Sequence, residues 1–410
     1  MNFKYILTLL ISTCYLAAEA QSNTEKTKNK ARIRLSGYLQ AQFQAAQRKG
    51  VSSWQGGDFD AASNNRYIIR RGRLKLERSD DRTKVVFQID GKPDGLVFND
   101  AYIEHQLKAD WPLYFSLGLS DKAFGYALSY SSSNRDFPER PMMYQSLFPK
   151  EKDVGATLSY KLSKSLPFLS VSLSAVNGNG LAAKDYDKHK DFLGNLHFSF
   201  KENKRTQIGF GSSFYWGKVE GKQQVYYKPT TNGYLLEPGI AGQPASLSRR
   251  YLGFDFQLEH KSAIGTSSLK TEYIFGQHPG LATSPSVSVT AANRSLSSQT
   301  ALPLYHRNFM GYYLWLNHQI GKSPISLLFS YDIFDPNTKL SGSQIGLAGS
   351  NTSAGDLRFN NFGAGIAFDL DENTKLSLYH DAVENERSQI AEYLTDVKDN
   401  VFTFRLQYKW

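Results

Sequence analysis

A dense group of arginine and lysine side chains near the start of the chain is the feature best suited to chemistry. Between positions 32 and 78 there are ten basic residues and only three acidic ones, in a chain of formal net charge +10. Guanidinium groups present a planar fork of donors to phosphate or carboxylate oxygens, and rings of Arg and Lys select anions in pores. The group therefore indicates attraction of anionic solutes. The alternative is that these charges are solvated, or paired with acids such as Glu77, Asp100 and Glu104.

The elements that must position these residues have a hydrophobic period of two. In the stretch 32–44, Ile33, Leu35 and Leu39 alternate with charged or polar residues. Strict alternation places one set of side chains on each face of a pleated strand. About sixteen such segments follow one another, near 32–45, 66–78, 82–92, 95–108, 112–120, 152–162, 166–177, 191–201, 204–217, 249–260, 266–277, 307–320, 324–335, 356–370, 373–384 and 398–410.

The length and spacing of these segments favour a transmembrane β-barrel over a soluble β-sandwich. They resemble the ~10-residue strands of membrane barrels more than the ~5–6-residue strands of soluble proteins. Short turns alternate with long connections, as in barrels with short periplasmic turns and long outer loops. We expect an all-β fold: one transmembrane antiparallel β-barrel of about 16 strands over residues 32–410. The long connections are 46–65, 121–151, 218–248, 278–306 and 336–355.

The first residues have the features of a secretory signal peptide. A lysine precedes a short apolar run, and Ala18-Glu19-Ala20 supplies the small-x-small pattern before Gln21. We expect a signal peptide over 1–20, cleaved near Ala20/Gln21, and a short polar periplasmic lead-in over 21–31. Secretion and a barrel together indicate the outer membrane of a Gram-negative bacterium, in contact with lipid and lipopolysaccharide. They argue against a nucleic-acid partner.

Several segments, in order, are similar to one family of porins. They are Arg70-Arg71-Gly72-Arg73-Leu74, Asn99-Asp100-Ala101-Tyr102-Ile103-Glu104, Leu117 to Gly125, Phe137-Pro138-Glu139-Arg140, Val176 to Gly180, Lys190-Asp191-Phe192 and Ser330 to Asn337. Across about residues 32–410, the chain resembles the phosphate-selective porin O and P family of Gram-negative outer membranes. The resemblance implies a 16-stranded trimeric barrel, a constriction loop folded into the pore and a preference for phosphate.

The candidate pore-lining residues follow from the alternation and from these segments. On the second strand Gly72, Leu74 and Leu76 are expected to face lipid, so that Arg70 falls on the lipid side, near the rim. A midplane arginine there would cost about 2–4 kcal/mol. The segment 121–150 is the expected constriction loop, with Lys150 a further candidate. The residues assigned to anion selectivity are Arg32, Arg34, Arg71, Arg73, Lys75, Lys122, Arg135 and Arg140.

The C-terminal strand carries a separate pattern. Phe404, Leu406, Tyr408 and Trp410 lie at alternate positions and end on an aromatic residue. This pattern resembles the signal that the barrel assembly machinery reads, although ordinary lipid-facing alternation also explains it. Aromatic residues elsewhere fit interfacial girdles, and five of them could instead stack on sugar rings: Tyr102, Tyr126, Tyr130, Tyr144 and Trp315.

Catalytic motifs are missing from the sequence. There is no G-x-S-x-G nucleophile elbow, no H-E-x-x-H zinc helix and no Walker phosphate loop. The only cysteine is Cys14, and the eight histidines lack metal-ligand spacing. We expect no enzyme, no metal and no cofactor, but a water-filled diffusion channel for small anions. The alternatives are a general or sugar-taking porin, a surface-binding outer-membrane protein, and an outer-membrane phospholipase.

Overall fold

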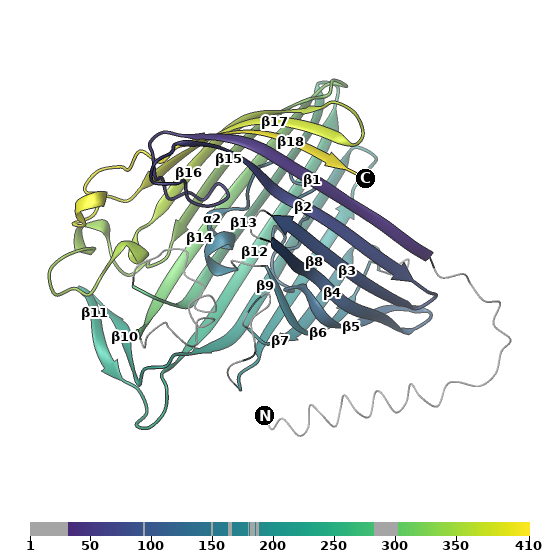
Figure 1. Cartoon of the computed structure of the whole chain (residues 1–410). Coiled ribbons are helices and arrows are strands. Elements are labelled where there is room, and N and C mark those ends of the chain that lie inside the picture. Colours follow the sequence, from purple (N-terminus) through teal and green to yellow (C-terminus); the bar gives the residue numbers. More distant parts are fainter. Residues whose placement is uncertain are drawn as a thin grey trace.

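The chain folds into a closed antiparallel β-barrel, as the alternation predicted. The computed structural model describes residues 32–92, 95–148, 151–162, 166–178, 180, 185, 188–282 and 302–410. Sixteen strands form the ring, and the first and last of them pair over nine residues to close it (Figure 1). The expected signal peptide and lead-in lie outside the described residues. No helix in the described part of the chain is long and apolar enough to cross a membrane.

The elements agree closely with the segments expected from the sequence. The ring consists of β1 (Arg32–Ala46), β2 (Asn65–Ser79), β3 (Thr83–Lys92), β4 (Gly95–Lys108), β5 (Trp111–Asp121), β6 (Lys152–Tyr160), β7 (Leu169–Val176), β8 (Asp191–Lys201), β9 (Thr206–Glu220), β12 (Ser246–Ser262), β13 (Gly265–Gly280), β14 (Leu304–Ile320), β15 (Ile325–Asp335), β16 (Phe359–Asp369), β17 (Thr374–Asn385) and β18 (Val401–Lys409). The connections hold β10 (Val225–Thr230), β11 (Gly233–Pro238), α2 (Met142–Leu147), η1 (Gly342–Gln344), η2 (Ala354–Asp356) and η3 (Ala391–Tyr393).

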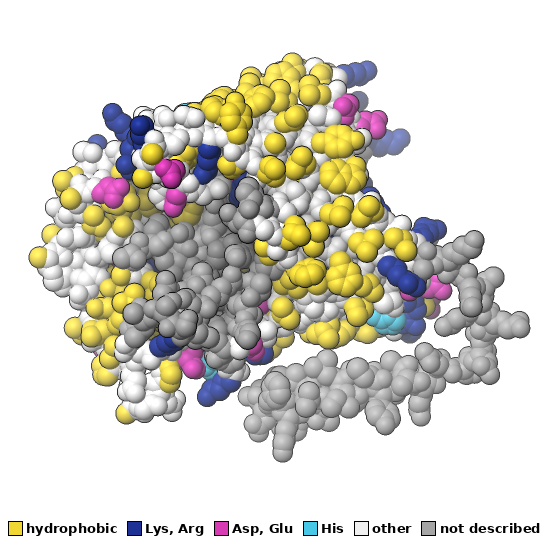
Figure 2. Space-filling view, viewed as in Figure 1, with side chains coloured by type: hydrophobic (Ala, Val, Ile, Leu, Met, Phe, Trp, Pro, Cys, Tyr) yellow, Lys and Arg dark blue, Asp and Glu magenta, His cyan; other side chains and the backbone are white. Residues whose placement is uncertain are grey.

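The outer wall of the barrel is apolar and the inner wall is polar. On β18, Phe404 and Tyr408 are exposed on the outside, whereas Arg405 and Gln407 are buried on the inside. Figure 2 shows hydrophobic side chains spread across the wall, with charged side chains gathered towards its ends. This arrangement matches a lipid-facing band between two aqueous rims. Trp111 and Trp216 are exposed on this wall, as residues of an aromatic girdle would be, whereas Tyr379 is buried inside the barrel.

A β-bulge in β2 overturns the predicted position of Arg70. Opposite β1, Gln40 pairs with Arg71 and Ala41 pairs with Ile69, so that Arg70 has no register partner. The bulge adds one residue to the strand and reverses the alternation beyond it. Both Arg70 and Arg71 therefore point into the lumen, and Arg70 binds a carboxylate there instead of lying on the lipid side.

The connection between β5 and β6 folds into the lumen, as expected for a constriction loop. We use this name for residues 122–151, of which 149 and 150 lie outside the described residues. The loop carries α2 and packs an apolar face against the inner wall of β9 and β12–β15. Phe137 stacks on Trp315 with ring centroids 4.9 Å apart, and Phe148 contacts Tyr215 and Tyr251. Burial of these rings holds the loop across the pore.

The connection 218–248, expected to be an outer loop, contains a β-hairpin. Strands β10 and β11 pair antiparallel, and β10 adds to β14 in parallel at Tyr226 and Tyr227 (Figure 1). Tyr227 stacks on Tyr305 with centroids 4.3 Å apart. The hairpin lies outside the ring, because β9 and β12 pair directly over fifteen residues.

The C-terminal tryptophan closes the seam between the first and last strands. Gly37 N–H donates to the Trp410 carbonyl at 3.1 Å, and Trp410 N–H donates back at 3.0 Å. The indole lies over Gly37, where an added Cβ would approach the ring to 2.5 Å. A side chain at position 37 would displace Trp410.

We expect the Trp410→Ala substitution to lower the amount of folded barrel in the outer membrane severalfold. Channels that do insert should keep their conductance, because Trp410 is at the seam and not in the constriction. The measurement is heat-modifiable gel mobility of outer-membrane fractions, followed by single-channel recording. Trp111→Ala, which removes an exposed ring from β5, is the matched control. Equal yields of the two variants would show that Trp410 carries no assembly signal.

Candidate functional site

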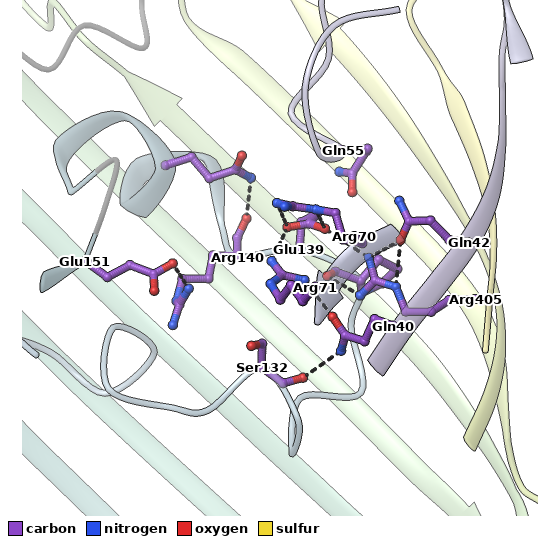
Figure 3. Close-up of polar contacts among 12 residues, drawn as sticks. Gln40, Gln42, Gln55, Arg70, Arg71, Ser132, Glu139, Arg140, Glu151 and Arg405 are labelled. Carbon is purple, nitrogen blue, oxygen red and sulfur yellow. Dashed lines mark hydrogen bonds and ion pairs between the residues drawn. The ribbon is translucent and has the colours of Figure 1, made fainter. Parts of the chain in front are cut away.

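Three arginines of the barrel wall converge on one carboxylate of the constriction loop (Figure 3). Glu139 accepts from Arg70 at 2.7 and 2.8 Å, from Arg71 at 2.7 Å and from Arg405 at 2.9 Å. We call these four residues the Glu139 cluster. Arg70 and Arg71 come from the bulge of β2, and Arg405 comes from β18, so the cluster links both neighbours of β1 to the loop.

The three arginines keep the Glu139 carboxyl ionised. Burial opposes ionisation of the carboxyl, but the charges of Arg70, Arg71 and Arg405 outweigh it and hold the pKa of Glu139 well below its usual range. A charge-assisted bidentate pair, such as that from Arg70, is among the stronger contacts available to a carboxylate. The cluster therefore contains one anion and three cations and retains excess positive charge.

Glutamine side chains on β1 tie the same part of the loop to the seam. Gln40 donates to the Ser132 carbonyl at 3.1 Å and accepts from Arg71 at 2.9 Å. Gln42 accepts two bonds from Arg405, whose third nitrogen reaches the Pro138 carbonyl at 2.6 Å. The loop segment 129–139, which we call the loop tip, is thus held by hydrogen bonds from both strands of the seam.

Arg135 is the one predicted selectivity residue that is buried without a partner. Its side chain lies in the loop tip, and none of its three guanidinium nitrogens makes a hydrogen bond within the described structure. Burial lowers the pKa of Arg135 to about 9, with a further contribution from the charge of Arg71. Arg135 therefore adds a positive charge to the loop tip that no carboxylate among the described residues pairs with.

The two ends of the constriction loop are held by ion pairs. Lys122 pairs with Asp153 at 3.1 Å, and Lys152 binds Asp100 at 2.6 Å and Asp121 at 2.7 Å. Arg140 pairs with Glu151 and donates to the carbonyls of Ala127 and Leu128 at 3.1 and 3.0 Å. These cations support the loop as well as charging the lumen.

Two buried carboxylates hold the opposite side of the loop. Glu272 on β13 accepts from the backbone N–H groups of Tyr126 and Ala127 and from the Tyr144 hydroxyl. Asp332 on β15 accepts from Met142 N–H, at the start of α2, at 2.6 Å. No cationic side chain pairs with either carboxylate within the described residues. The body of the loop is thus attached to β13 and β15, and its tip to β1, β2 and β18.

A cavity remains beside the loop tip, and most of the charged side chains that line it are basic. It has a volume of about 470 Å³ and is lined by six cationic and three anionic side chains. The anions Asp100, Asp121 and Glu151 are each paired with a lining cation. We call this space the cationic cavity. Its cations are Arg34, Arg73, Lys75, Arg140, Lys152 and Lys409.

The structure separates the eight predicted selectivity residues into three groups. Five are in ion pairs: Arg71 with Glu139, Arg73 with Asp90, Lys75 with Glu77, Lys122 with Asp153 and Arg140 with Glu151. Arg32 and Arg34 make no ion pair with any described residue, and Arg34 lines the cationic cavity. Arg135 is buried in the loop tip. Lys150 lies outside the described residues.

Sequence reasoning missed several residues of the site. Arg405 and Lys409 alternate with the lipid-facing aromatics of the last strand, and that alternation places them in the lumen. Glu139 belongs to the segment Phe137-Pro138-Glu139-Arg140, but nothing in the sequence marked it as the partner of three arginines. Among the five candidate sugar-stacking rings, Tyr144 and Trp315 are buried. Tyr126 and Tyr130 stack on each other, with centroids 5.3 Å apart, and Tyr102 lines a cavity.

Comparison with solved structures identifies the fold as that of outer-membrane porins. The outer membrane channel DcaP of Acinetobacter baumannii aligns with a TM-score of 0.55 at 12% identity, over 95% of this chain and 100% of that chain. OmpT of Vibrio cholerae, in its trimer form, gives 0.53 at 9% identity, over 93% and 100%. A Salmonella typhi OmpF complex with daunomycin gives 0.51 at 11%, over 92% and 97%. No protein-family model and no curated protein matches the sequence.

These similarities show a porin-like β-barrel fold. Identities of 9–12% show the fold alone. No comparison supports the phosphate-selective family specifically.

Proposed function

We propose that the protein is an outer-membrane diffusion channel that favours small anions and has no catalytic step. The observation that carries this proposal is the cationic cavity, in which every lining carboxylate is paired and two of the six lining cations, Arg34 and Lys409, have no carboxylate partner among the described residues. An anion that enters the cavity meets unpaired positive charge on β1 and β18, whereas Arg73 and Lys75 of β2 are paired with Asp90 and Glu77. Binding must stay weak for release, which exposed Lys and Arg groups in water provide.

The resemblance to phosphate-selective porins makes phosphate or a polyphosphate the first solute to test. The competing proposal is a general porin without anion preference. The extensive ion pairing favours it, because five of the eight predicted cations already have carboxylate partners. A paired charge contributes little field at a distance, since the carboxylate cancels it.

Reversal potential in a planar bilayer under a KCl gradient separates the two proposals. We expect anion selectivity, followed by saturable block of the chloride current on titration with phosphate. The double variant Arg34→Gln/Lys409→Gln should reduce the selectivity without disturbing the loop, because neither side chain pairs with a described carboxylate. Lys204→Gln/Lys322→Gln, in the turns after β8 and β14, has the same charge change and is the control. Cation selectivity or none in the unmodified channel would reject the proposal.

We also propose that the channel is a trimer. Only two positions separate the end of β3 at Lys92 from the start of β4 at Gly95, at the end of the barrel where most connections are long. Large apolar side chains are exposed there, including Phe87, Leu96 and Phe98. Burial of these side chains between protomers would be favourable.

We further propose three steps in the delivery of the protein. A signal peptide is cleaved near Ala20/Gln21, the barrel assembly machinery inserts the barrel, and the inserted barrel contacts lipopolysaccharide.

A further inference from the structure

A second cavity adjoins the cationic cavity and has a different chemistry. It has a volume of about 300 Å³ and is lined mainly by uncharged polar side chains from β4 to β8. Those that carry hydroxyl groups include Tyr102, Ser116, Ser120, Thr157, Ser159 and Ser172. We call this space the hydroxyl cavity. The two cavities share Lys75, Asp100, Asp121 and Ser129 in their linings, so they lie side by side in the lumen.

The charges that line the hydroxyl cavity are balanced. Asp100 and Asp121 bind Lys152, and Glu104 binds Lys84 at 3.1 Å and Lys161 at 2.7 Å. Because each carboxylate already has an ammonium partner, this half of the lumen offers little net charge to a solute. Its hydroxyl groups both donate and accept hydrogen bonds, which matches the hydroxyl groups of a polyol.

Two of the hydroxyl groups are available to a solute. Within the described structure, the hydroxyls of Tyr102 and Ser120 make no hydrogen bond to the protein. By contrast, Ser159 and Ser172 bind each other at 3.1 Å, and Thr157 binds Ser174 at 2.8 Å. The Tyr102 ring lies opposite Gly118, which has no side chain to cover it. The Lys84 ammonium lies over the ring, 5.8 Å from its centroid, and the phenol group remains for a solute.

We propose that the preferred solutes are small polyhydroxylated anions, the chemical class of sugar acids and sugar phosphates. The anionic group occupies the cationic cavity, while the hydroxylated chain lies along Tyr102 and Ser120 in the hydroxyl cavity. This inference rests on the proposed anion channel and narrows its solute class. Inorganic phosphate would use only the cationic cavity, and an uncharged sugar would use only the hydroxyl cavity.

Block of the chloride current by size-matched probes tests the proposal. Gluconate carries one negative charge and five hydroxyl groups, hexanoate carries the charge on an apolar chain, and glucose carries the hydroxyl groups alone. Glucosamine, which is cationic near neutral pH, tests whether the carboxylates of the hydroxyl cavity dominate instead. We expect gluconate to block at a concentration about tenfold lower than each of the other three, as two or more net hydrogen bonds would produce.

The Tyr102→Phe/Ser120→Ala variant should remove the preference for gluconate over hexanoate and leave the reversal potential unchanged. Neither hydroxyl has a protein partner, so the variant leaves no buried group unsatisfied. Tyr273→Phe, which removes a phenol hydroxyl from the lipid-facing side of β13, is the matched control.

The possible outcomes separate the two proposals. Equal block by gluconate and hexanoate in an anion-selective channel would overturn the solute class and leave the anion channel standing. Strongest block by glucosamine would also overturn it, as would an unchanged gluconate preference in the double variant. Absence of anion selectivity in the unmodified channel would instead reject the proposed function. The probe comparison needs only the unmodified protein, so it remains decisive if the variant does not assemble.

Discussion

Replacement of Glu139 by alanine is expected to release the loop tip, raise the single-channel conductance and strengthen the preference for anions. The substitution leaves Arg70, Arg71 and Arg405 close together without their shared carboxylate. Removal of one partner from a buried ion pair typically costs about 3–5 kcal/mol, because the remaining charges stay desolvated. The barrel strands keep their backbone hydrogen bonds, so the loop tip is the part that should move.

Single-channel conductance, reversal potential and thermal unfolding in detergent would all report this change. Glu392→Ala is the control, since it removes the same charge from an exposed pair with Arg48, separated by 3.4 Å. Exposed pairs of this kind contribute about 0–1 kcal/mol. If Glu139→Ala matched the control in all three measurements, the Glu139 cluster would not hold the loop.

Acidification should affect the Glu139 cluster only at low pH. The folded-state pKa of Glu139 lies below its ordinary value. The stabilisation is therefore complete above the unfolded pKa of about 4.3 and is lost as the pH falls through the depressed folded value. Glu139 itself should cause no change in conductance between neutral pH and about pH 5.

The second large effect is expected at Glu272. In Glu272→Ala, two backbone N–H groups and the Tyr144 hydroxyl lose their acceptor in the interior of the lumen. Each unsatisfied buried donor costs about 1–3 kcal/mol. The body of the constriction loop should then detach from β13, and the current through one channel should fluctuate between several levels instead of holding one.

Glu272→Gln separates hydrogen bonding from charge at this position. The amide keeps an acceptor oxygen for the backbone N–H groups of Tyr126 and Ala127. Loss of the negative charge leaves no cation unpaired, because no cationic side chain among the described residues contacts Glu272. We expect a steady current close to that of the unmodified channel. Large fluctuations in the glutamine variant, or none in the alanine variant, would contradict the role assigned to these hydrogen bonds.

The strands and their inner and outer faces could be predicted because alternation is a local property of the chain. Leu39 lies between Tyr38 and Gln40 in the sequence, and β1 exposes Leu39 on its outer face and buries Tyr38 and Gln40. The sixteen segments follow from the same rule, repeated. The hairpin β10–β11 could not be predicted from alternation, because each of its strands has only six residues. The hairpin also contains Pro229 and Gly233, which are typical of loops.

The arrangement of the site could not be read in the same way, because it depends on residues far apart in the sequence. The bulge that turns Arg70 inward exists only in the pairing of β2 with β1. Arg405 meets Glu139 across 266 positions. The sequence indicated that cations gather in the lumen, but which of them bind carboxylates and which remain for a solute depends on how the constriction loop packs.

The seam between β1 and β18 has a consequence for how the protein must be made. Gln40 and Gln407, which bind each other at 2.6 Å, are 367 positions apart, so the ring cannot close before the last strand has been synthesised. Until then both terminal strands carry unpaired backbone groups, which are templates for aggregation. The chain therefore needs protection from synthesis until the ring closes. A prematurely terminated copy has no route to the closed state and is left as a substrate for proteolysis.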